Sequence, residues 1–193
     1  MKKENWKISI EKRIGESIKT KELLLRDAET IEMIWGAAKA IRESFAKGGK
    51  ILLCGNGGSA SDALHIAGEL TGRFQKERRA LPAVALNADM ASITAVANDY
   101  GYEMVFSRAV EGLMNPEDVL LGISTSGNSE NVYRAVKKAK ELGAVTAALL
   151  GNDGGKIKSA VDYGIIVPGS STARIQESHI MIGHIICELV EAD

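Results

Sequence analysis

The sequence predicts an α/β protein: a three-layer αβα sandwich around a five-stranded parallel sheet, with additional helices at the N-terminus. Two observations lead to this fold class. Five short apolar segments lack the alternation of a half-buried strand, so we expect strands that are buried on both faces. Segments with helical periodicity separate these strands, and strands that alternate with helices form a parallel, doubly wound sheet of the flavodoxin-like kind.

Residues 5–47 are expected to be helical throughout. Their apolar side chains recur at helical spacings rather than in alternation. A polar break predicts two helices, with Asp27 as a candidate cap of the second and Gly48-Gly49 as its end. We expect residues 1–47 to serve oligomerisation, with an intramolecular strut as the alternative, and residues 48–193 to form the main domain.

From Lys50 onward, strands and helices alternate in the sequence. Strands are predicted at 51–54, 83–86, 119–123, 145–150 and 163–167. Helices are predicted at 59–71, 90–97, 101–114, 128–142 and 172–191. Ligands of doubly wound sheets bind outside the carboxyl ends of the strands. The loops that follow the first and third strands should therefore lie together at that edge.

The composition is that of an ordinary globular protein: 45% of the 193 residues are hydrophobic and 25% are charged. The formal net charge is −1, so no basic excess indicates a nucleic acid as partner. Cys54 and Cys187 fall in a predicted strand and a predicted helix, as expected of buried thiols in a reducing compartment.

We expect a cytoplasmic protein that does not associate with membranes. Lys2 and Lys3 are not followed by the apolar region of a signal peptide. No stretch approaches the roughly 18 apolar residues of a membrane-spanning helix.

A glycine-rich loop follows the first predicted strand. Gly55, Gly57 and Gly58 allow a sharp turn and a close approach of the backbone to a ligand. The helix that begins there offers free N–H groups and a positive dipole end, both of which favour an anion. His65 and Glu69 lie one turn apart on this helix, on the same face.

A second polar loop, Ser124-Thr125-Ser126-Gly127-Asn128-Ser129, follows the third predicted strand. Its hydroxyl groups, backbone N–H groups and helix start are what a phosphate group needs. The alternative is an ordinary N-cap, but a cap explains one of these residues and leaves the others without a role.

The histidines are candidate metal ligands, with packed or surface positions on their helices as the alternative. His65 and Glu69 have the i, i+4 spacing of metal ligands on a helix face. The last helix adds polar residues to an apolar stretch, and buried polar groups need partners. These polar residues are Gln176, Glu177, His179 and His184. A zinc-type site with nitrogen and oxygen ligands would supply such a partner.

The spacing of Gln176 and His184 restricts how they can share one metal ion. They lie about 80° apart around a helix and about 12 Å apart along it. Either their side chains converge on a point between them, or one ligand comes from a neighbouring subunit.

Asn98 and Asp99 close the predicted helix at 90–97, near the same edge of the sheet. They could bind sugar hydroxyl groups, or they could simply form the turn before Gly101.

Long motifs of this chain resemble those of the SIS (sugar isomerase) domain family. They are Gly55-Asn56-Gly57-Gly58-Ser59, Glu69-Leu70-Thr71-Gly72-Arg73-Phe74, Gly122-Ile123-Ser124-Thr125-Ser126-Gly127-Asn128-Ser129 and Arg174-Ile175-Gln176-Glu177. More narrowly, they resemble the branch that isomerises sedoheptulose 7-phosphate in bacterial heptose biosynthesis. Ala173 departs from the acidic residue that some members carry at this position.

The resemblance implies a five-stranded parallel sheet, a homotetramer with active sites between subunits, and one Zn²⁺ per subunit. The implied metal ligands are His65, Glu69, Gln176 and His184. The implied catalytic base is Glu69 and the implied acid is His184. The implied substrate contacts are Asn56, Gly57, Gly58, Glu69, Asn98, Asp99, Ser124, Thr125, Ser126, Ser129 and Gln176.

The resemblance therefore implies an aldose–ketose isomerase acting on a sugar phosphate. The same fold has a non-catalytic branch that binds a protein partner such as a replication initiator, and this is one alternative. Glu69 and His184 favour the enzyme, since that branch lacks the full His/Glu/His set. A different SIS reaction on another sugar phosphate is a further alternative.

Overall fold

The sheet of the computed structural model, which describes residues 3–192, has five parallel strands in the order β2-β1-β3-β4-β5. The strands are β1 (Ile51–Gly55), β2 (Ala83–Ala85), β3 (Val119–Ser124), β4 (Val145–Gly151) and β5 (Tyr163–Val167). The central strands β1 and β3 are buried along their whole length, as the absence of alternation predicted. The predicted doubly wound α/β fold is confirmed.

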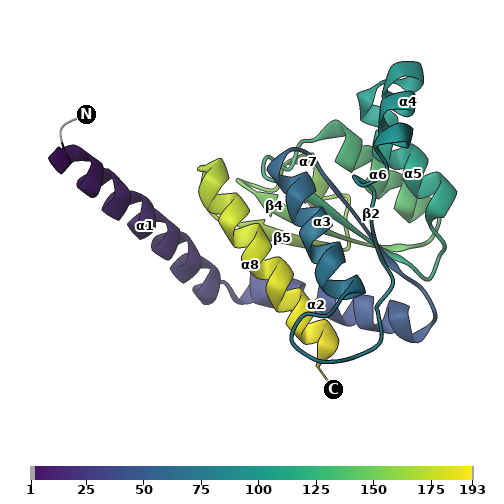
Figure 1. Cartoon of the computed structure of the whole chain (residues 1–193), viewed down its shortest axis with the longest axis horizontal. Helices are drawn as coiled ribbons and strands as arrows, with labels where there is room; N and C mark the ends of the chain where they lie inside the picture. The colour runs from purple at the N-terminus through teal and green to yellow at the C-terminus, as the bar shows by residue number, and fades with distance from the viewer. Residues whose placement is uncertain (1–2, 193) are drawn as a thin grey trace.

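Helices cover both faces of this sheet (Figure 1). The α-helices are α1 (Lys3–Arg26), α2 (Ala28–Ala46), α3 (Gly58–Thr71), α4 (Met90–Tyr100), α5 (Val105–Leu113), α6 (Glu130–Glu141), α7 (Gly155–Lys158) and α8 (Thr172–Glu191). Successive side chains of β1 enter different cores. Leu53 packs with Ile41, Ile66 and Ile182 of α2, α3 and α8, whereas Leu52 belongs to the core beneath α5 and α6. The three layers follow from this division.

The segment after α4 differs from the prediction. The helix expected at 101–114 is divided into a short 3₁₀ helix, η1 (Tyr102–Met104), and α5. Gly101 has φ +94 and ends α4, which therefore runs three residues beyond the predicted end at Ala97. Asn98 and Asp99 consequently lie in the last turn of α4 rather than after it.

The break between α1 and α2 falls where it was predicted. The carboxylate of Asp27 accepts a hydrogen bond from the backbone N–H of Thr30 (3.1 Å), which is the expected cap. Side chains of α2 such as Ile41 and Phe45 are buried in the main core. The division of the chain at residue 47 stays a prediction.

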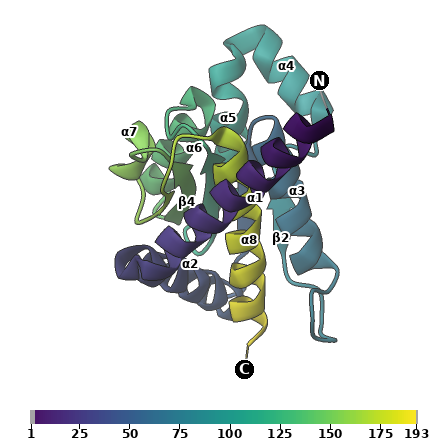
Figure 2. The same ribbon diagram turned by 90° about the vertical axis from the view of Figure 1, so that its left-hand side faces the viewer.

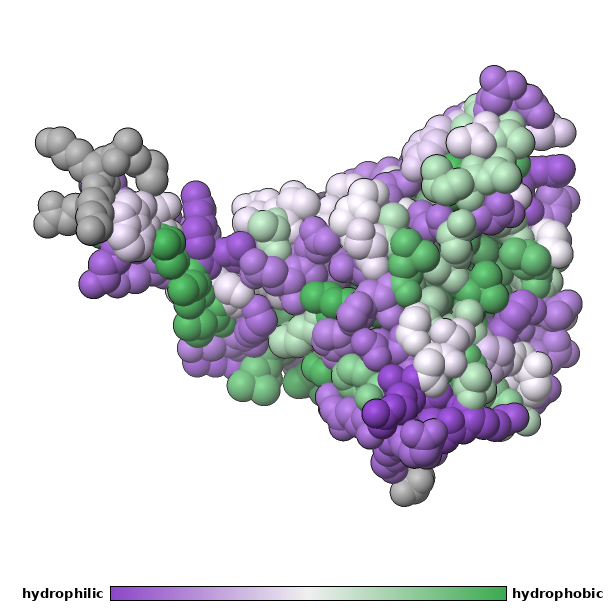
Figure 3. Space-filling model, viewed as in Figure 1, coloured by the Kyte–Doolittle hydropathy of each residue, from purple (hydrophilic) through white to green (hydrophobic). Residues whose placement is uncertain are grey.

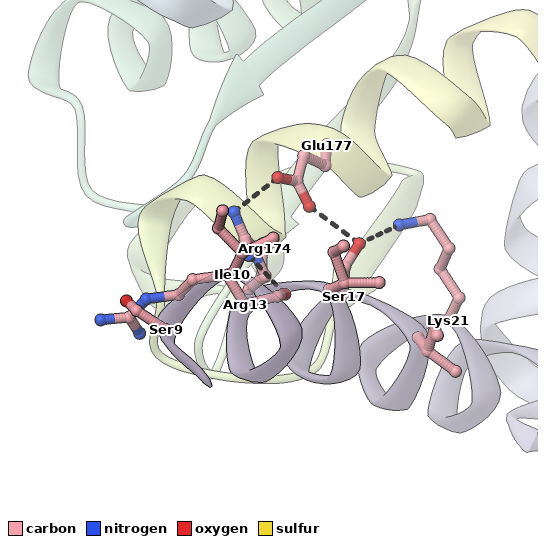
Figure 4. Close-up of a pocket in the computed structure, with 9 residues that line it drawn as sticks. Ser9, Ile10, Arg13, Ser17, Lys21, Arg174 and Glu177 are labelled. Atoms are coloured by element: carbon pink, nitrogen blue, oxygen red, sulfur yellow. Dashed lines mark hydrogen bonds and ion pairs between the residues drawn. The ribbon is translucent and has the colours of Figure 1, made fainter. Parts of the chain in front are cut away.

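Helix α1 lies across α8 and extends beyond the sheet (Figures 1 and 2). Hydrogen bonds tie the two helices together: Ser17 Oγ donates to Glu177 (2.9 Å), and Arg174 donates to the backbone carbonyl of Arg13 (2.7 Å). These groups border a groove of about 560 Å³ (Figure 4).

Much of the apolar surface of α1 remains open to solvent, and Figure 3 shows it as hydrophobic patches along the projecting helix. Ile10, Ile14 and Ile18 are 51–56% exposed, and Leu25 is 77% exposed. Within the part of the chain that the structure describes, no helix is both long and apolar enough to cross a membrane.

Candidate functional site

The two predicted loops meet at the carboxyl edge of the sheet. β1 and β3 are neighbours, and Gly55 lies beside Ile123 in their register. The glycine loop leaves β1 at this point and leads directly into α3, while the Ser/Thr loop leaves β3 and leads into α6. The sheet therefore brings together two loops that are about 70 residues apart in the sequence.

The glycine loop is tightly built. A Cβ at Gly55 would lie 2.7 Å from the carbonyl oxygen of Ser59, so a side chain does not fit there. Gly57 has φ +55, a conformation that glycine adopts readily. The Asn56 and Asn131 side chains exchange hydrogen bonds of 2.8 and 2.9 Å, which ties the loop to α6.

The hydroxyl groups of the Ser/Thr loop gather at the start of α6. Ser124 Oγ lies 2.9 Å from Ser129 Oγ and 3.5 Å from Ser126 Oγ. Ser129 occupies the N-cap position of α6, yet its side chain makes no capping hydrogen bond. The ordinary cap that was the alternative for this residue is therefore absent. Thr125 lies in the same turn, where its backbone carbonyl accepts a hydrogen bond from Asn152 (3.1 Å).

Three predicted metal ligands from α3 and α8 lie close together. His65, Glu69 and His184 each offer a ligand atom, and these atoms lie within 4.8 Å of one another. The Nε2 atoms of the two imidazoles are 2.9 Å apart, and His65 Nε2 is 3.2 Å from a Glu69 carboxylate oxygen. The donor set of two imidazoles and a carboxylate suits a zinc-type ion.

The close approach of α3 and α8 makes this cluster possible. Gly183, which precedes His184, faces Ile66, which follows His65. A Cβ at Gly183 would lie 2.6 Å from Ile66 Cδ1, closer than packed carbon atoms approach. The missing side chain at Gly183 therefore sets the separation of the two helices.

Gln176 contacts the N-terminal part of α3. Its side-chain amide occupies the place that a Cβ of Gly58 would need, and it is near enough to the Asp62 carboxylate to act against the raised pKa of that group. Asp62 lies one turn before His65 on α3. Gln176 thus faces the same helix as the cluster, and its predicted part in metal binding stays a prediction.

Asn98 and Asp99 are exposed on α4, where the Asn98 amide donates to the Asp99 carboxylate (2.8 Å). The following η1 approaches the glycine loop, because the Tyr102 hydroxyl donates to Asn56 (2.9 Å). The proposed contact of Asn98 and Asp99 with a sugar stays a prediction.

Asp62 is a polar residue of this region that sequence reasoning missed. It is only 7% exposed, and one of its carboxylate oxygens has no hydrogen-bond partner among the described residues. Burial raises its pKa, against the opposing effects of the Gln176 side chain and of nearby His65. Its place one turn before His65 is the sequence signal that could have indicated it.

His179, named among the polar residues of the last helix, lies outside the cluster. It is fully buried, and its Nε2 donates to the carbonyl oxygen of Leu150 (2.9 Å). Burial lowers its pKa to about 4, which keeps the imidazole neutral. His179 is thus a core residue.

The doubly wound sheet, with polar loops at its carboxyl edge beside a His/Glu/His cluster, defines a class of α/β proteins built around a small-molecule site. A family model described as "SIS domain" matches residues 19–151. The phosphoheptose isomerase of Nitratiruptor sp. is 55% identical over 176 residues, covering 87% of this chain and 94% of that protein. The phosphoheptose isomerase of Clostridium acetobutylicum is 49% identical over 184 residues, covering 95% of this chain and 94% of that protein.

Solved structures agree with these relatives. The phosphoheptose isomerase of Neisseria gonorrhoeae superimposes with a TM-score of 0.90 at 43% identity, covering 96% of this chain and 98% of that one. The phosphoheptose isomerase of Francisella tularensis gives 0.89 at 38% identity, covering 95% and 96%. The chain belongs to the SIS domain family and, within it, to the phosphoheptose isomerases.

Proposed function

We propose that this chain is an aldose–ketose isomerase that converts D-sedoheptulose 7-phosphate to D-glycero-D-manno-heptose 7-phosphate. The reaction would take place in the cytoplasm and supply heptose for lipopolysaccharide or another surface glycan. The observation that carries the proposal is the position of Glu69 and His184 in one cluster, on a chain whose relatives are phosphoheptose isomerases. The same observation disfavours the alternative that the chain is a non-catalytic protein that binds a protein partner.

The Ser/Thr loop is proposed to hold the phosphate. The Ser124, Ser126 and Ser129 hydroxyls converge at the start of α6, where Thr125 and backbone N–H groups can add to the binding of an anion. A phosphate held there would position the distant reacting carbons by its binding energy.

The glycine loop is proposed to bind the sugar. Asn56 would hydrogen-bond its hydroxyl groups, and the absence of side chains at Gly57 and Gly58 would let the sugar approach the backbone. Further sugar contacts are assigned to Asn98, Asp99 and Gln176.

Glu69 is proposed as the base. Its carboxylate would take a proton from C1 of the ketose, which gives an enediol, and return the proton to C2, which gives the aldose. In a state in which its imidazole does not hold the metal, His184 would donate a proton to the carbonyl oxygen and accept one from the neighbouring hydroxyl, so that no net proton is gained or lost.

The residues present fit Zn²⁺ as a cofactor. Nitrogen and oxygen donors of His65, Glu69 and His184 converge, and Gln176 is proposed as the further ligand. When bound, zinc would polarise the substrate carbonyl and stabilise negative charge on the oxygens.

We further propose that the chain forms a homotetramer in which α1 packs on another subunit. The exposed side chains of Ile10, Ile14, Ile18 and Leu25 lie at helical spacings and give α1 an apolar stripe. Light scattering should show the tetramer for the wild type and smaller species for Ile14→Glu combined with Ile18→Glu. Unchanged mass for that variant would contradict the assignment of α1 to the interface.

An activity assay tests the proposed function directly. Sedoheptulose 7-phosphate is incubated with the purified chain, and the aldose is followed by NMR beside five- and six-carbon sugar phosphates. The heptose substrate should be converted and the shorter sugars much less. Exhaustive chelation should abolish conversion, and added Zn²⁺ should restore it. No conversion by the zinc-loaded chain would refute the proposal.

A further inference from the structure

The loop between α3 and β2 is held against the end of α8 by one buried carboxylate, that of Glu191. It accepts hydrogen bonds from the backbone N–H groups of Phe74 (3.0 Å), Gln75 (2.9 Å) and Lys76 (3.1 Å). Arg78 forms an ion pair with it at 2.7 Å, and the Glu191 side chain is only 2% exposed. With these three backbone hydrogen bonds and one ion pair, the Glu191 carboxylate holds the loop in one conformation.

Arg78 connects this carboxylate to the helix that carries Glu69. Its guanidinium donates to the backbone carbonyl oxygens of Leu70 (2.9 Å) and Glu69 (3.0 Å). These oxygens belong to the last turn of α3, whose carbonyl groups have no backbone N–H donor within the helix. Glu191 and Arg78 therefore fix the end of α3 relative to α8.

The same loop places an aromatic ring on the metal cluster. The Phe74 ring stacks on the imidazole of His184, with ring centroids 5.4 Å apart and an interplanar angle of 16°. His184 lies seven residues before Glu191 on α8, about two helical turns. The Phe74 backbone N–H donates a hydrogen bond to the Glu191 carboxylate, so the loop that carries the Phe74 ring is attached to the same helix as His184.

We propose that Glu191 and Phe74 are positioning residues for the metal cluster. Glu191 fixes the loop, and the Phe74 ring lies against the His184 imidazole and keeps its Nε2 atom directed toward His65 and Glu69. This inference rests on the proposed metal centre, but the orientation of His184 can be measured without metal and without substrate.

The test uses the full-length chain labelled with ¹³C at histidine Cε1, freed of metal by chelation and kept at pH 8. His184→Gln assigns the His184 resonance. A ring stacked on an imidazole displaces its proton signal upfield. Phe74→Leu should remove this displacement, Phe74→Tyr should keep it, and Glu191→Gln should reduce it because the loop loses its charged anchor.

Competition with a chromogenic chelator measures the affinity for Zn²⁺ in the same variants. Outer groups that orient a ligand typically change metal affinity by about 10-fold or more, and we expect such a loss for Phe74→Leu and Glu191→Gln. Glu188→Gln is the matched control: Glu188 accepts a hydrogen bond from the Gln75 side chain (3.0 Å) rather than from the loop backbone. It should leave both readouts unchanged.

A purely structural role gives a different result. If Phe74→Leu removes the ring displacement and lowers the melting temperature but leaves the affinity for Zn²⁺ as in the wild type, the positioning role is wrong. An equal effect of Glu188→Gln would also overturn it. If the affinity for Zn²⁺ falls as expected in Phe74→Leu and Glu191→Gln but the wild type fails to isomerise the heptose phosphate, the positioning stands and the proposed function fails.

Discussion

Replacing Gly183 by alanine tests whether the separation of α3 and α8 is fixed by packing. The new Cβ would lie 2.6 Å from Ile66 Cδ1 and 2.8 Å from Ile66 Cγ1, and Ile66 is fully buried. Such overpacking costs about 1–3 kcal/mol. Alanine is favoured over glycine inside a helix by about 0.5–1 kcal/mol. The net expectation is a loss of about 1 kcal/mol in the free energy of unfolding.

The assay is urea unfolding of the wild type, of Gly183→Ala, of Ile66→Val and of the double variant that combines them. All are measured at one fixed protein concentration, because the stability of an oligomer depends on concentration. Ile66→Val removes Cδ1, the nearer of the two Ile66 atoms in conflict, and so relieves part of the collision. The double variant should therefore lose less stability than the two single variants predict together, with a coupling of about 1 kcal/mol. Gly112→Ala, in α5 with nothing within 4 Å of its Cβ, is the control that shows the helix preference alone.

Displacement of α8 should also move His184 away from His65, so Gly183→Ala should bind Zn²⁺ more weakly than Gly112→Ala does. A Gly183→Ala protein as stable as the control, with additive effects of Ile66→Val, would refute the packing argument.

Two further predictions concern the Ser/Thr loop and the response to acid. Gly127 has φ +66, and a Cβ at this position would collide with the Gly154 carbonyl. Gly127→Ala should therefore lower the free energy of unfolding in urea by about 2 kcal/mol or more and weaken inhibition of the enzyme by inorganic phosphate. Phosphate inhibition unchanged from the wild type would contradict the proposed phosphate loop. Burial would raise the pKa of Glu191, but hydrogen bonds from Gln75, Lys76 and Phe74 and the Arg78 charge lower it to about 2, from an ordinary value of 4.5. The stabilising contribution of Glu191 is therefore present above pH 4.5 and is lost as the pH falls toward 2. The difference in free energy of unfolding between the wild type and Glu191→Gln should shrink in urea titrations from pH 5 to pH 3. A constant difference would contradict the lowered pKa of Glu191.

Local patterns in the sequence predicted much of this fold. β5 and α8 have the predicted bounds, because an apolar run and a long helical periodicity leave few alternatives. The division of residues 101–114 was not predicted, because the positive φ of Gly101 and the one-turn η1 leave no periodic pattern.

The candidate site could be predicted only in part. His65 and Glu69 share a helix face at a spacing that the sequence shows directly, whereas their approach to His184 depends on the packing at Gly183. Phe74 belongs to a recognised motif, but its stacking on His184 depends on the anchor at Glu191, 117 residues away. Such long-range contacts leave no periodic signal in one sequence.

The most direct test of the proposed mechanism is the turnover of Glu69→Gln at saturating sedoheptulose 7-phosphate. Loss of a general base should lower turnover by about 100-fold or more, while the affinity for the substrate remains near that of the wild type. Glu111→Gln, the same exchange at an exposed glutamate of α5, should retain full activity. A Glu69→Gln enzyme that isomerises at nearly the wild-type rate would contradict the assignment of Glu69 as the base.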